Sequence, residues 1–425
     1  MITKPALSRE EGFAEAQDKA DPLASFREEF EWPVDDQDRR VTYLLGNSLG
    51  LLPKGARALV NEELDEWARR GVEGHMKART PWYTYHEFLR DSTARLVGAR
   101  PEEVVVMNTL TTNLHLMLAS FYRPQGKRVK VVMEENAFPS DQYAIPSHLA
   151  VRGVDASNVI VARARPGEAT LRTEDLMQLF EDQGSEIALL LLGGVNYYSG
   201  QLFELGALAA AAKRAGIMVG YDLAHAVGNA PLSLHDWDVD FGVWCSYKYL
   251  NGGPGAPGGC FVHKRHGDDT SIKRFAGWWG NDPNTRFQMR SEFTARTSAD
   301  GWQLSNPPIL SMAPLRASMD LFEQAGFARL RAKSEALTGY LEALLSAIPN
   351  SPVRVLTPSN PAERGCQLSL YIAGKGRAVH DALRSKGILT DYREPDVVRM
   401  APTPMYNSYG DVWRTANAMR EVLTG

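Results

Sequence analysis

The chain has 425 residues, of which 44% are apolar and 23% are charged, and its formal net charge is −4 at pH 7. This composition is typical of a folded protein and argues against a disordered chain, while the length favours two domains over a single hydrophobic core. The slightly acidic balance offers no broad basic surface, so we expect no nucleic acid partner.

The N-terminus and the cysteines indicate where the protein works. Residues 1–21 carry many charges and lack the apolar segment of a secretory signal, and no stretch reaches the ~20 apolar residues of a membrane helix. The three cysteines are an odd number without a CxxC pair, which predicts neither a disulfide framework nor a cysteine-rich zinc site. We therefore expect a cytoplasmic protein with no membrane partner and no metal.

The first clear element along the chain is a helix. Residues 56–70 place Leu59, Val60, Leu64 and Trp67 at helical spacing, with charged residues between them. This pattern predicts an amphipathic surface helix.

The middle of the chain has the pattern of an α/β domain. From residue 104 onward, short apolar runs alternate with helical stretches such as 173–182 and 205–215, which predicts a mostly parallel sheet. Several runs are almost wholly apolar, as expected for strands that helices cover on both faces. The seven expected strands are residues 104–108, 129–134, 159–164, 187–195, 217–222, 241–246 and 259–263.

The C-terminal part predicts a second, smaller domain. Residues 314–347 form a long helical pattern, and strand-like pieces such as 367–372 then alternate with helices, which is typical of an α+β domain. Paired prolines after Asn306 give a local boundary signal. We expect an N-terminal segment, 1–70, that packs with the small domain, a large cofactor-binding domain, 71–310, and the small domain itself, 311–425.

A carboxylate ends one of the expected strands. Asp222 closes the apolar run 217–222, and burying its charge without a cationic partner would be costly. Ligands of open α/β sheets bind beyond the carboxyl ends of the strands, where a protonated pyridine nitrogen could supply that cation. His225 would then lie beside the ring. Taken alone, Asp222 is equally explained as a helix cap or turn residue, and His225 as a structural residue.

A lysine follows the next expected strand. Lys248 comes after the run 241–246 and leads into the glycine-rich stretch 251–259. An amine enclosed beside a cofactor loses its proton more readily and can then react with an aldehyde. Asp222 and Lys248 follow successive strands and are therefore expected in one crevice, although most lysines are only solvated surface charges.

Two further segments are candidates for binding a phosphate and an aromatic ring. Residues 108–113 form a threonine-rich turn before an apolar helix, and free amides at a helix N-terminus bind phosphate. Phe138 offers a flat face to a pyridine ring, with polar contacts from Ser140 and Asp141. The threonines are equally explained as a helix N-cap, and Phe138 as a core residue.

Motifs along most of the chain resemble the kynureninase family, whose members are aminotransferase-like, fold-type I enzymes that use pyridoxal 5'-phosphate. The resembling segments are residues 45–50, 108–118, 138–141, 222–229, 244–251, 277–280, 305–308 and 399–408. The resemblance implies hydrolysis of L-kynurenine or its 3-hydroxy form to L-alanine and anthranilate or 3-hydroxyanthranilate, in tryptophan catabolism and NAD biosynthesis. It also implies an α/β fold with a mostly parallel seven-stranded sheet and a smaller α+β domain.

The resemblance assigns roles to individual residues. It implies that Lys248 binds the cofactor covalently and acts in catalysis with Tyr247 and Asp222. It also implies that Arg399 pairs its guanidinium with the substrate carboxylate, with Ser48 close by. The full expected cofactor shell is Leu110, Thr111, Phe138, Ser140, Asp141, Asp222, His225, Tyr247, Lys248, Trp278 and Asn306.

A homodimer with shared active sites is implied as well, because Trp278 and Asn306 would close the site from a neighbouring subunit. His75, together with Ser305 and Asn306, resembles the pattern of family members that favour the 3-hydroxy substrate. Gly193 departs from members that have a serine near the phosphate, so one contact to the cofactor is in doubt.

Two other functions stay open on the sequence alone. A cysteine-desulfurase-like lyase of the same fold would need a cysteine on a mobile loop, and Cys366 is the candidate for it. A ligand-sensing module without turnover is the second, although a sensor has no need to retain Lys248, Asp222 and Arg399 together.

Overall fold

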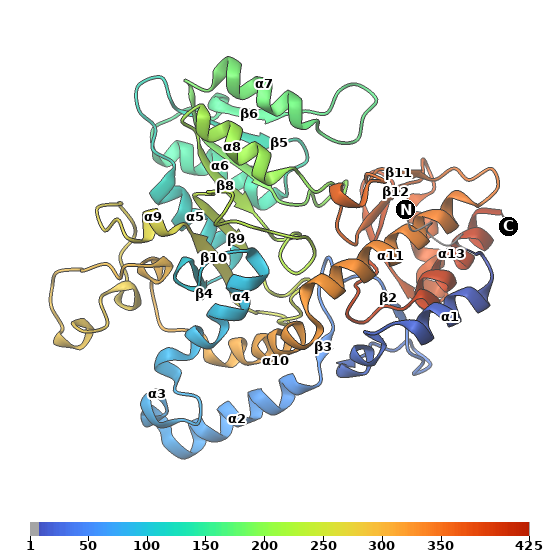
Figure 1. The fold of residues 1–425 in the computed structure, drawn as a ribbon, viewed down its shortest axis with the longest axis horizontal. Helices are drawn as coiled ribbons and strands as arrows, with labels where there is room; N and C mark the ends of the chain where they lie inside the picture. Colours follow the sequence, from blue (N-terminus) through green and yellow to red (C-terminus); the bar gives the residue numbers. More distant parts are fainter. Residues whose placement is uncertain (1–7, 425) are drawn as a thin grey trace.

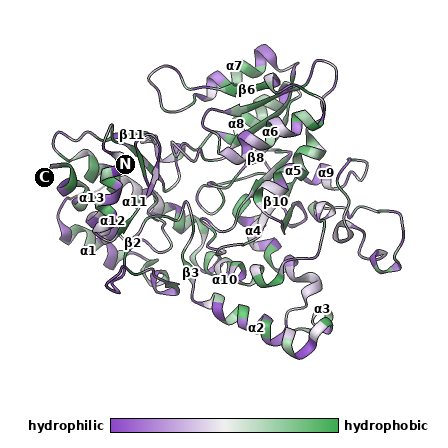
Figure 2. Cartoon of the chain, turned by 180° about the vertical axis from the view of Figure 1, so that it is seen from behind, coloured by the Kyte–Doolittle hydropathy of each residue, from purple (hydrophilic) through white to green (hydrophobic). Residues whose placement is uncertain are grey.

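A computed structural model describes residues 8–424 and has two unequal halves (Figure 1). The larger half is built on a seven-stranded sheet, and the smaller half, to the right in Figure 1, holds a second sheet and both chain ends. Figure 2 shows the molecule from behind, with apolar residues concentrated in the strands and polar residues in the surface loops.

The predicted seven-stranded, mostly parallel sheet is confirmed. Its strand order is β4-β10-β9-β8-β7-β5-β6, and β10 is the one strand that runs antiparallel to its neighbours. Each strand lies within a few residues of its predicted position. The strands are β4 (Val104–Met107), β5 (Lys130–Glu134), β6 (Val159–Ala162), β7 (Ile187–Gly193), β8 (Met218–Asp222), β9 (Phe241–Trp244) and β10 (Gly258–Val262).

Helices cover both faces of this sheet, because side chains of a strand point alternately to its two sides. In β7, Leu190 and Leu192 join the apolar cluster of α7 (Thr173–Gln183) and α8 (Leu205–Arg214). Leu189 and Leu191 join the opposite cluster. It contains residues of α5 (Leu110–Phe121) and α6 (Pro139–Val151). Burial on both sides explains why the strand is apolar throughout.

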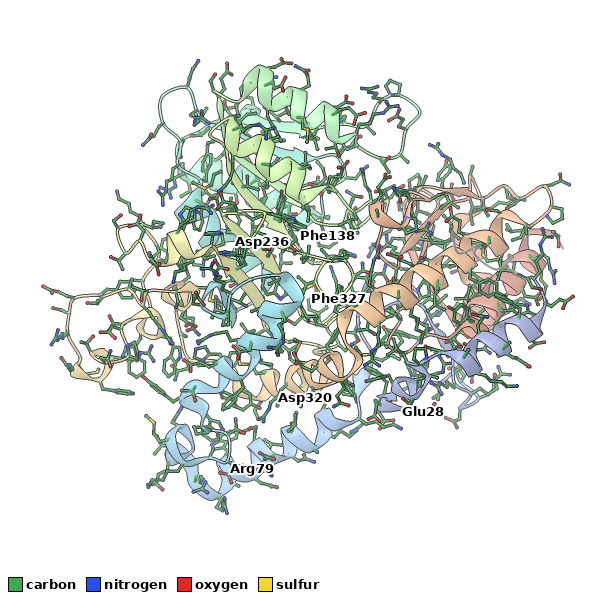
Figure 3. All side chains as sticks on the ribbon, viewed as in Figure 1. Glu28, Arg79, Phe138, Asp236, Asp320 and Phe327 are labelled. Atoms are coloured by element: carbon green, nitrogen blue, oxygen red, sulfur yellow. The ribbon has the colours of Figure 1, made fainter. Side chains whose placement is uncertain are left out.

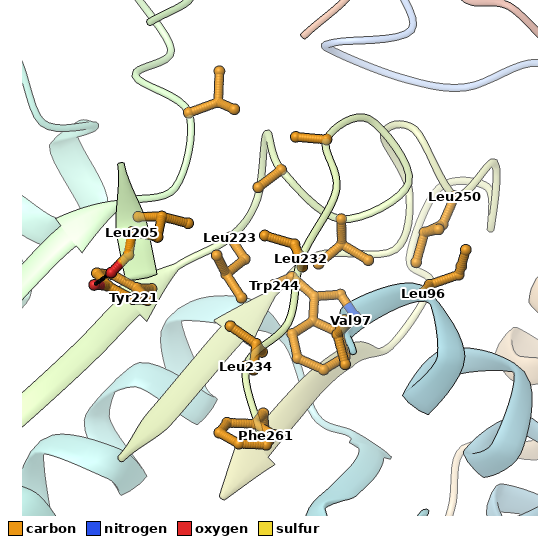
Figure 4. Close-up of a cluster of buried hydrophobic side chains, with 14 of the residues drawn as sticks. Leu96, Val97, Leu205, Tyr221, Leu223, Leu232, Leu234, Trp244, Leu250 and Phe261 are labelled. Carbon is orange, nitrogen blue, oxygen red and sulfur yellow. Dashed lines mark hydrogen bonds between the residues drawn. The ribbon is translucent and has the colours of Figure 1, made fainter. Parts of the chain in front are cut away.

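Large side chains fill the core beneath the ends of β8 and β9. Tyr221, Trp244 and Phe261 are fully buried there, and the Tyr221 hydroxyl donates a 2.7 Å hydrogen bond to the Leu205 carbonyl (Figure 4). Gly259 makes room for Trp244, because a Cβ at this glycine would lie 2.1 Å from the indole ring. Truncating such an aromatic core residue costs about 3–5 kcal/mol. This packing holds the carboxyl ends of β8 and β9 in place.

The smaller half combines the C-terminal region with the start of the chain. Its sheet has the order β11-β12-β15-β14 and is antiparallel. The N-terminal helix packs against the last helix, and β2 pairs with β13 in parallel. The predicted boundaries at residues 70 and 310 stay predictions. The elements are α1 (Glu11–Ala20), β2 (Thr42–Tyr43), β11 (Arg354–Val355), β12 (Leu368–Tyr371), α12 (Gly376–Ser385), β13 (Ile388–Leu389), β14 (Asp391–Arg393), β15 (Val397–Met400) and α13 (Tyr409–Thr424).

One long helical region was expected at 314–347, and the structure has two helices there instead. They are α10 (Ile309–Ala325) and α11 (Phe327–Ser346), and α11 crosses from the larger half to the smaller one (Figure 1). The break falls at Gly326, whose φ of +74° is a left-handed conformation that glycine adopts without strain. The sequence pattern missed it because helical periodicity continues on both sides of one glycine.

The predicted amphipathic helix forms as α2 (Gly55–Arg70), with Leu59 and Val60 half-buried, but two of its large apolar side chains point outward. Leu64 is 41% exposed and Trp67 is 58% exposed, whereas Glu63 and Glu66 are buried. The Glu63 carboxylate accepts a 2.7 Å hydrogen bond from the Trp82 indole. An apolar stripe that faces away from the chain's own core is suited to contact another molecule.

The remaining short elements connect the two halves or lie at the periphery. They are β1 (Phe30–Glu31), β3 (Leu52–Pro53), α3 (Gly74–Lys77), α4 (Arg90–Val97) and α9 (Lys264–Gly267). Within residues 8–424, no helix combines the length and the apolar character that crossing a membrane requires.

The buried carboxylate Asp300 gives the fold an expected weakness in acid. Burial by itself would raise its pKa, but the His86 imidazole, whose Nε2 lies 3.6 Å from Oδ1, and the nearby arginine charges outweigh burial and lower the pKa to about 2. Arg90 lies 2.9 Å and Arg296 lies 3.3 Å from the carboxylate. Because the folded pKa is below the unfolded one, this group stabilises the fold above pH ~4 and loses that effect as the pH falls toward 2.

We expect Asp300→Asn to lower the free energy of unfolding by about 2 kcal/mol at pH 7, from the size of this pKa shift. The difference from the unmodified protein should shrink steadily between pH 4 and pH 2, as measured by urea unfolding. The exposed Asp268 supplies the control, and Asp268→Asn should change little at any pH. A penalty that stays constant with pH would contradict the assignment.

Candidate active site

The carboxyl ends of β7, β8 and β9 lie side by side and open into one cavity. Gly193 pairs with Asp222, and Asp222 pairs with Val243, so the three strand ends are in register. Lys248 follows β9 directly and reaches the same space. The space at these strand ends, including its open mouth to solvent, measures about 490 Å³. Its lining is Leu110, Thr111, Glu134, Phe138, Ser140, Asp141, Gly193, Val195, Tyr197, Asp222, Ala224, His225, Tyr247 and Lys248.

The Lys248 amine stands at the centre of this cavity and is almost fully buried. Its Nζ lies 3.1 Å from Nε2 of His225 and 5.5 Å from the centroid of the Phe138 ring. Burial, followed by the charge of Lys248, holds the pKa of His225 well below its usual value. His225 is therefore neutral, and its Nε2 can accept a hydrogen bond from the amine.

Three buried carboxyl groups face this one lysine. Burial and the neighbouring charge of Asp222 raise the pKa of Asp141 well above its usual value, so Asp141 keeps its proton. Burial also raises the pKa of Asp222, but the 2.8 Å hydrogen bond from the Ala224 amide and the charge of Lys248 counter this rise, so Asp222 is the carboxylate of the pair. Burial raises the pKa of Glu134 to about 7, and both its oxygens lie 3.1 Å from the Gly193 amide. A cavity with more buried acid than base favours a ligand that brings a positive charge next to Asp222.

Two helices begin at the cavity wall, and their N-termini are suited to bind a negatively charged group. The first turn of α5 contains Leu110 and Thr111, and the first turn of α6 contains Ser140, two residues after Phe138 at the helix N-cap. Free amides at the start of a helix bind anions. Neither first turn contains an arginine or a lysine, so amides and hydroxyls are the groups that would hold a phosphate there.

These residues fit pyridoxal phosphate, the cofactor that the sequence predicted. Phe138 presents a ring face, 39% exposed, and lies between the two halves of the molecule in Figure 3. Among residues 8–424, buried polar atoms without a hydrogen-bond partner include Nδ1 of His225 and Oδ1 of Asp141, both in this wall. Unsatisfied polar atoms around one cavity are what a polar ligand would satisfy. The residues can thus hold a ring, its cationic nitrogen, a phosphate and an aldehyde carbon.

Arg399 lies just behind the cavity, on β15 of the smaller half. Its side chain is buried and donates a 2.7 Å hydrogen bond to the Tyr197 carbonyl, and the Tyr197 ring meets Phe138 edge-on at 5.2 Å. Burial lowers the pKa of Arg399 to about 10, so the guanidinium still carries its charge at neutral pH.

A second carboxylate already pairs with this arginine. Asp391, on the neighbouring strand β14, forms an ion pair with Arg399 and also lies 3.1 Å from Arg393 and 3.4 Å from the Ser48 hydroxyl. The Nε atom of Arg399 is among the buried atoms that have no hydrogen-bond partner in the described chain. A substrate carboxylate at this guanidinium would therefore compete with Asp391.

Six residues that the sequence assigned to the site lie outside the lining of this cavity within one chain; two of them, Arg399 and Ser48, form the group with Asp391. His75 packs against Trp82, with ring centroids 5.4 Å apart, and Trp278 is 44% exposed beside Phe287. Ser305 and Asn306 are exposed. A single chain thus brings together nine of the eleven predicted cofactor-binding residues, but not Trp278 or Asn306.

The sequence analysis missed Glu134, Tyr197 and Asp391. Glu134 ends a predicted strand just as Asp222 does, so the same rule could have found it. Tyr197 and Asp391 carried no usable signal, because their roles depend on how the two halves of the molecule meet.

Comparison with known proteins gives close relatives over nearly the whole chain. The chain is 53% identical to a protein named kynureninase from Myxococcus xanthus over 415 residues, covering 97% of both chains. It is 51% identical to a kynureninase from Koribacter versatilis over 410 residues, covering 96% of this chain and 97% of the relative. Residues 330–419 match the family model described as the kynureninase C-terminal domain.

Solved structures with the same fold are more distant in sequence. The cysteine desulfurase CsdA from Escherichia coli aligns with a TM-score of 0.76 at 16% identity, covering 95% of this chain and 98% of its own. The cystine C–S lyase C-DES aligns with a TM-score of 0.75 at 18% identity, covering 89% and 97%. At such identities the likeness shows the fold alone, which is the aminotransferase-like fold type I expected from the sequence.

The two aspartates are expected to differ in their importance for cofactor affinity. Asp222→Asn removes the charge that faces the ring nitrogen and should weaken binding of pyridoxal phosphate about tenfold or more. Asp141→Asn replaces a group that is already neutral, so affinity should stay within about threefold. Absorbance titration of the cofactor-free protein measures both constants. Equal losses in the two variants would show that the proton does not reside on Asp141.

Proposed function

The chain belongs to the kynureninase family, and from this premise we propose how its own residues perform the reaction. It is a pyridoxal-phosphate-dependent hydrolase that cleaves a carbon–carbon bond of kynurenine, releasing L-alanine and anthranilate. The observation that carries the residue assignment is the meeting of Asp222 and Lys248 in one cavity at the ends of adjacent parallel strands.

The cofactor, when bound, supplies a covalent attachment for the substrate amine and accepts electrons from it. Lys248 is the residue that anchors it, and Asp222 keeps a proton on its ring nitrogen by opposing that charge. Phe138 stacks on the ring, and the amides at the start of α5 and α6 hold the phosphate. Leu110, Thr111, Ser140 and His225 complete this contact set.

Lys248 also moves the proton of the substrate's α-carbon. Released from the cofactor, its Nζ would be available to accept this proton in a buried cavity, where water competes little for it. His225 can hold this amine through its neutral Nε2 at 3.1 Å. A histidine that stays neutral orients the lysine without repelling its charged form.

Tyr247 is our assignment for acid–base help at the substrate's γ-carbonyl, where water must add before the carbon–carbon bond breaks. Its hydroxyl contacts the Cys245 thiol, and burial raises its pKa above the usual value. A phenol with a raised pKa keeps its proton at neutral pH and can donate it to a developing oxyanion.

Arg399 binds the substrate carboxylate and Asp391 holds the arginine in place before substrate arrives. The two lie opposite one another in the β14–β15 register. When a substrate carboxylate pairs with the guanidinium, Arg393 remains as an alternative partner for Asp391. Ser48, which contacts Asp391, belongs to the same substrate-side group.

The functional unit we propose is a homodimer in which each chain completes the other's site. Its support is the exposure of Trp278, Ser305 and Asn306 within one chain, together with the outward apolar stripe of α2. His75, Ser305 and Asn306 would then contact the substrate ring and favour the 3-hydroxy form through hydrogen bonds to its hydroxyl.

A cysteine-desulfurase function is disfavoured by the cysteines themselves. Such chemistry needs an accessible thiol, yet Cys245, Cys260 and Cys366 are all buried and unpaired. Burial raises the pKa of Cys366 to about 12, which keeps it as an unreactive thiol. Three free thiols suit a reducing compartment, so we place the protein in the cytoplasm.

We expect the purified protein to convert L-kynurenine to anthranilate, followed by its fluorescence, and Lys248→Ala to lower turnover about a thousandfold or more. Borohydride should trap the cofactor on the unmodified protein but not on this variant. The exposed Lys375 supplies the control, and Lys375→Ala should keep full activity. Release of sulfide from cysteine without anthranilate from kynurenine would overturn the proposal.

The same assay tests the substrate preference. The ratio kcat/KM for the 3-hydroxy substrate should be about tenfold higher than that for kynurenine. This is the difference expected when one buried hydrogen bond to the substrate hydroxyl stabilises the transition state. A strong preference for unsubstituted kynurenine would remove the role given to His75 and Asn306.

Mixing two defective variants tests the shared site. Lys248→Ala lacks the anchoring lysine, and a chain with Trp278→Ala and Asn306→Ala lacks the residues given to the neighbour. A hybrid dimer regains one intact site, so equal mixing after subunit exchange should restore about a quarter of normal turnover. If each chain builds its own site, the mixture should only average the two variants.

A further inference from the structure

A second cluster of ionisable side chains lies at the opposite end of the same strands. Glu103 directly precedes β4, His235 precedes β9, and His263 directly follows β10. Because β10 runs antiparallel to both of its neighbours, these three positions meet. One ligand atom from each residue lies within 4.8 Å of the others. Asp222 and Lys248 stand beyond the other ends of β8 and β9, so the cluster is separate from the cofactor site.

Glu103 is the fixed centre of this cluster. It is fully buried, and its Oε2 accepts a 2.9 Å hydrogen bond from the Arg100 amide while Oε1 accepts one of 2.8 Å from the Lys264 amide. The same Oε1 lies 2.8 Å from Nδ1 of His235 and 4.0 Å from Nδ1 of His263. Within the described chain, the salt-bridge partners of this buried carboxylate are these two imidazoles.

The two imidazoles are arranged so that both Nδ1 atoms face the carboxylate. Their rings stack at 10°, with centroids 4.9 Å apart. Nδ1 of His263 accepts a 3.2 Å hydrogen bond from the Arg265 amide, so its proton is on Nε2, and a metal ion at Nδ1 would replace that hydrogen bond. Burial also lowers the pKa of His263, which keeps the ring neutral.

A carboxylate stands behind His263. Oδ1 of Asp238 lies 3.5 Å from its Nε2, on the side away from Glu103. A histidine that binds a metal usually donates its other N–H to a carboxylate, which fixes the ring and makes the free nitrogen more basic. Lys213 and Arg265 lie close by but already pair with Asp238 and Asp240, which leaves the Glu103 charge without a cationic side chain of its own.

We propose that Glu103, His235 and His263 bind one divalent transition metal ion of the Zn²⁺ type. Two imidazole nitrogens and one carboxylate oxygen are a usual ligand set for Zn²⁺, with a fourth position left for water, and the partly exposed side chain of His235 gives solvent access. On binding, the His235 ring would keep its proton on Nε2 and offer the Nδ1 lone pair to the metal in place of the hydrogen bond to Glu103. Protons compete with a metal ion for imidazole nitrogens, so affinity falls with falling pH. No local motif indicates this site, because its ligands come from three distant segments of the sequence.

Such an ion would tie together the segments that enter β4 and β9 and leave β10. Its effect is on stability, because the cofactor lies beyond the other ends of the strands. Zn²⁺ should therefore raise the melting temperature and leave kynurenine turnover unchanged, and this separates failure of the proposal from any failure of the proposed function.

The cofactor-loaded protein is first freed of metal with a chelator and dialysed. It is then titrated with Zn²⁺ in a calorimeter. We expect one Zn²⁺ per chain and a matching rise in melting temperature. His235→Gln keeps a donor to Glu103 but lacks the imidazole, and should weaken binding about 100-fold. Asp238→Asn should weaken it about tenfold. The backbone of Asp238 has a φ of +55°, a left-handed conformation that asparagine also adopts readily, so this substitution should not disturb the fold.

A matched control comes from His380, which lies on the smaller half and bonds only to the Thr390 hydroxyl among side chains of the described residues. His380→Gln should bind Zn²⁺ as the unmodified protein does. Absence of saturable binding at one ion per chain would overturn the proposal. So would equal affinity in His235→Gln, and the cluster would then be a hydrogen-bonded brace only.

Discussion

The site depends on the parallel register of β7, β8 and β9, which brings Gly193, Asp222 and Lys248 to one wall of one cavity. A carboxylate and an amine that are 26 positions apart would not meet without it. The register in turn depends on the aromatic core beneath, where Tyr221 and Trp244 are fully buried and Gly259 leaves space for the indole ring. Packing sets the geometry, and the chemistry follows from it.

The balance of charge in the cavity is the second constraint. Glu134, Asp141 and Asp222 are buried together, and Lys248 is the one lysine among the lining residues. Burial raises the pKa of all three carboxyl groups, and the rise is larger for Asp141 than for Asp222 beside it. In our proposal Asp222 is the carboxylate that opposes the ring nitrogen. His225 adds a neutral acceptor, so the lysine is oriented without further charge.

The sequence predicted those parts of the molecule that local residue patterns determine. Uniformly apolar runs identified the strands of the large sheet, and polar residues at the ends of two of them located Asp222 and Lys248. What the sequence could not give depends on contacts between distant segments. Gly326 interrupts a continuous helical pattern, and Asp391 matters only because β14 lies beside β15. Helical spacing likewise indicated an apolar stripe on α2 but not the direction in which it faces.

One consequence of the two-part architecture concerns how the protein can change. The residues that we assign to the ring and the phosphate belong to the larger half, whereas Arg399 belongs to the smaller half and donates its hydrogen bond across to the Tyr197 carbonyl. A mutation that tilts the smaller half by a fraction of an ångström would shift the guanidinium assigned to the substrate carboxylate and leave the cofactor-binding residues in place. Substrate choice can thus drift during evolution while the costly catalytic apparatus stays intact.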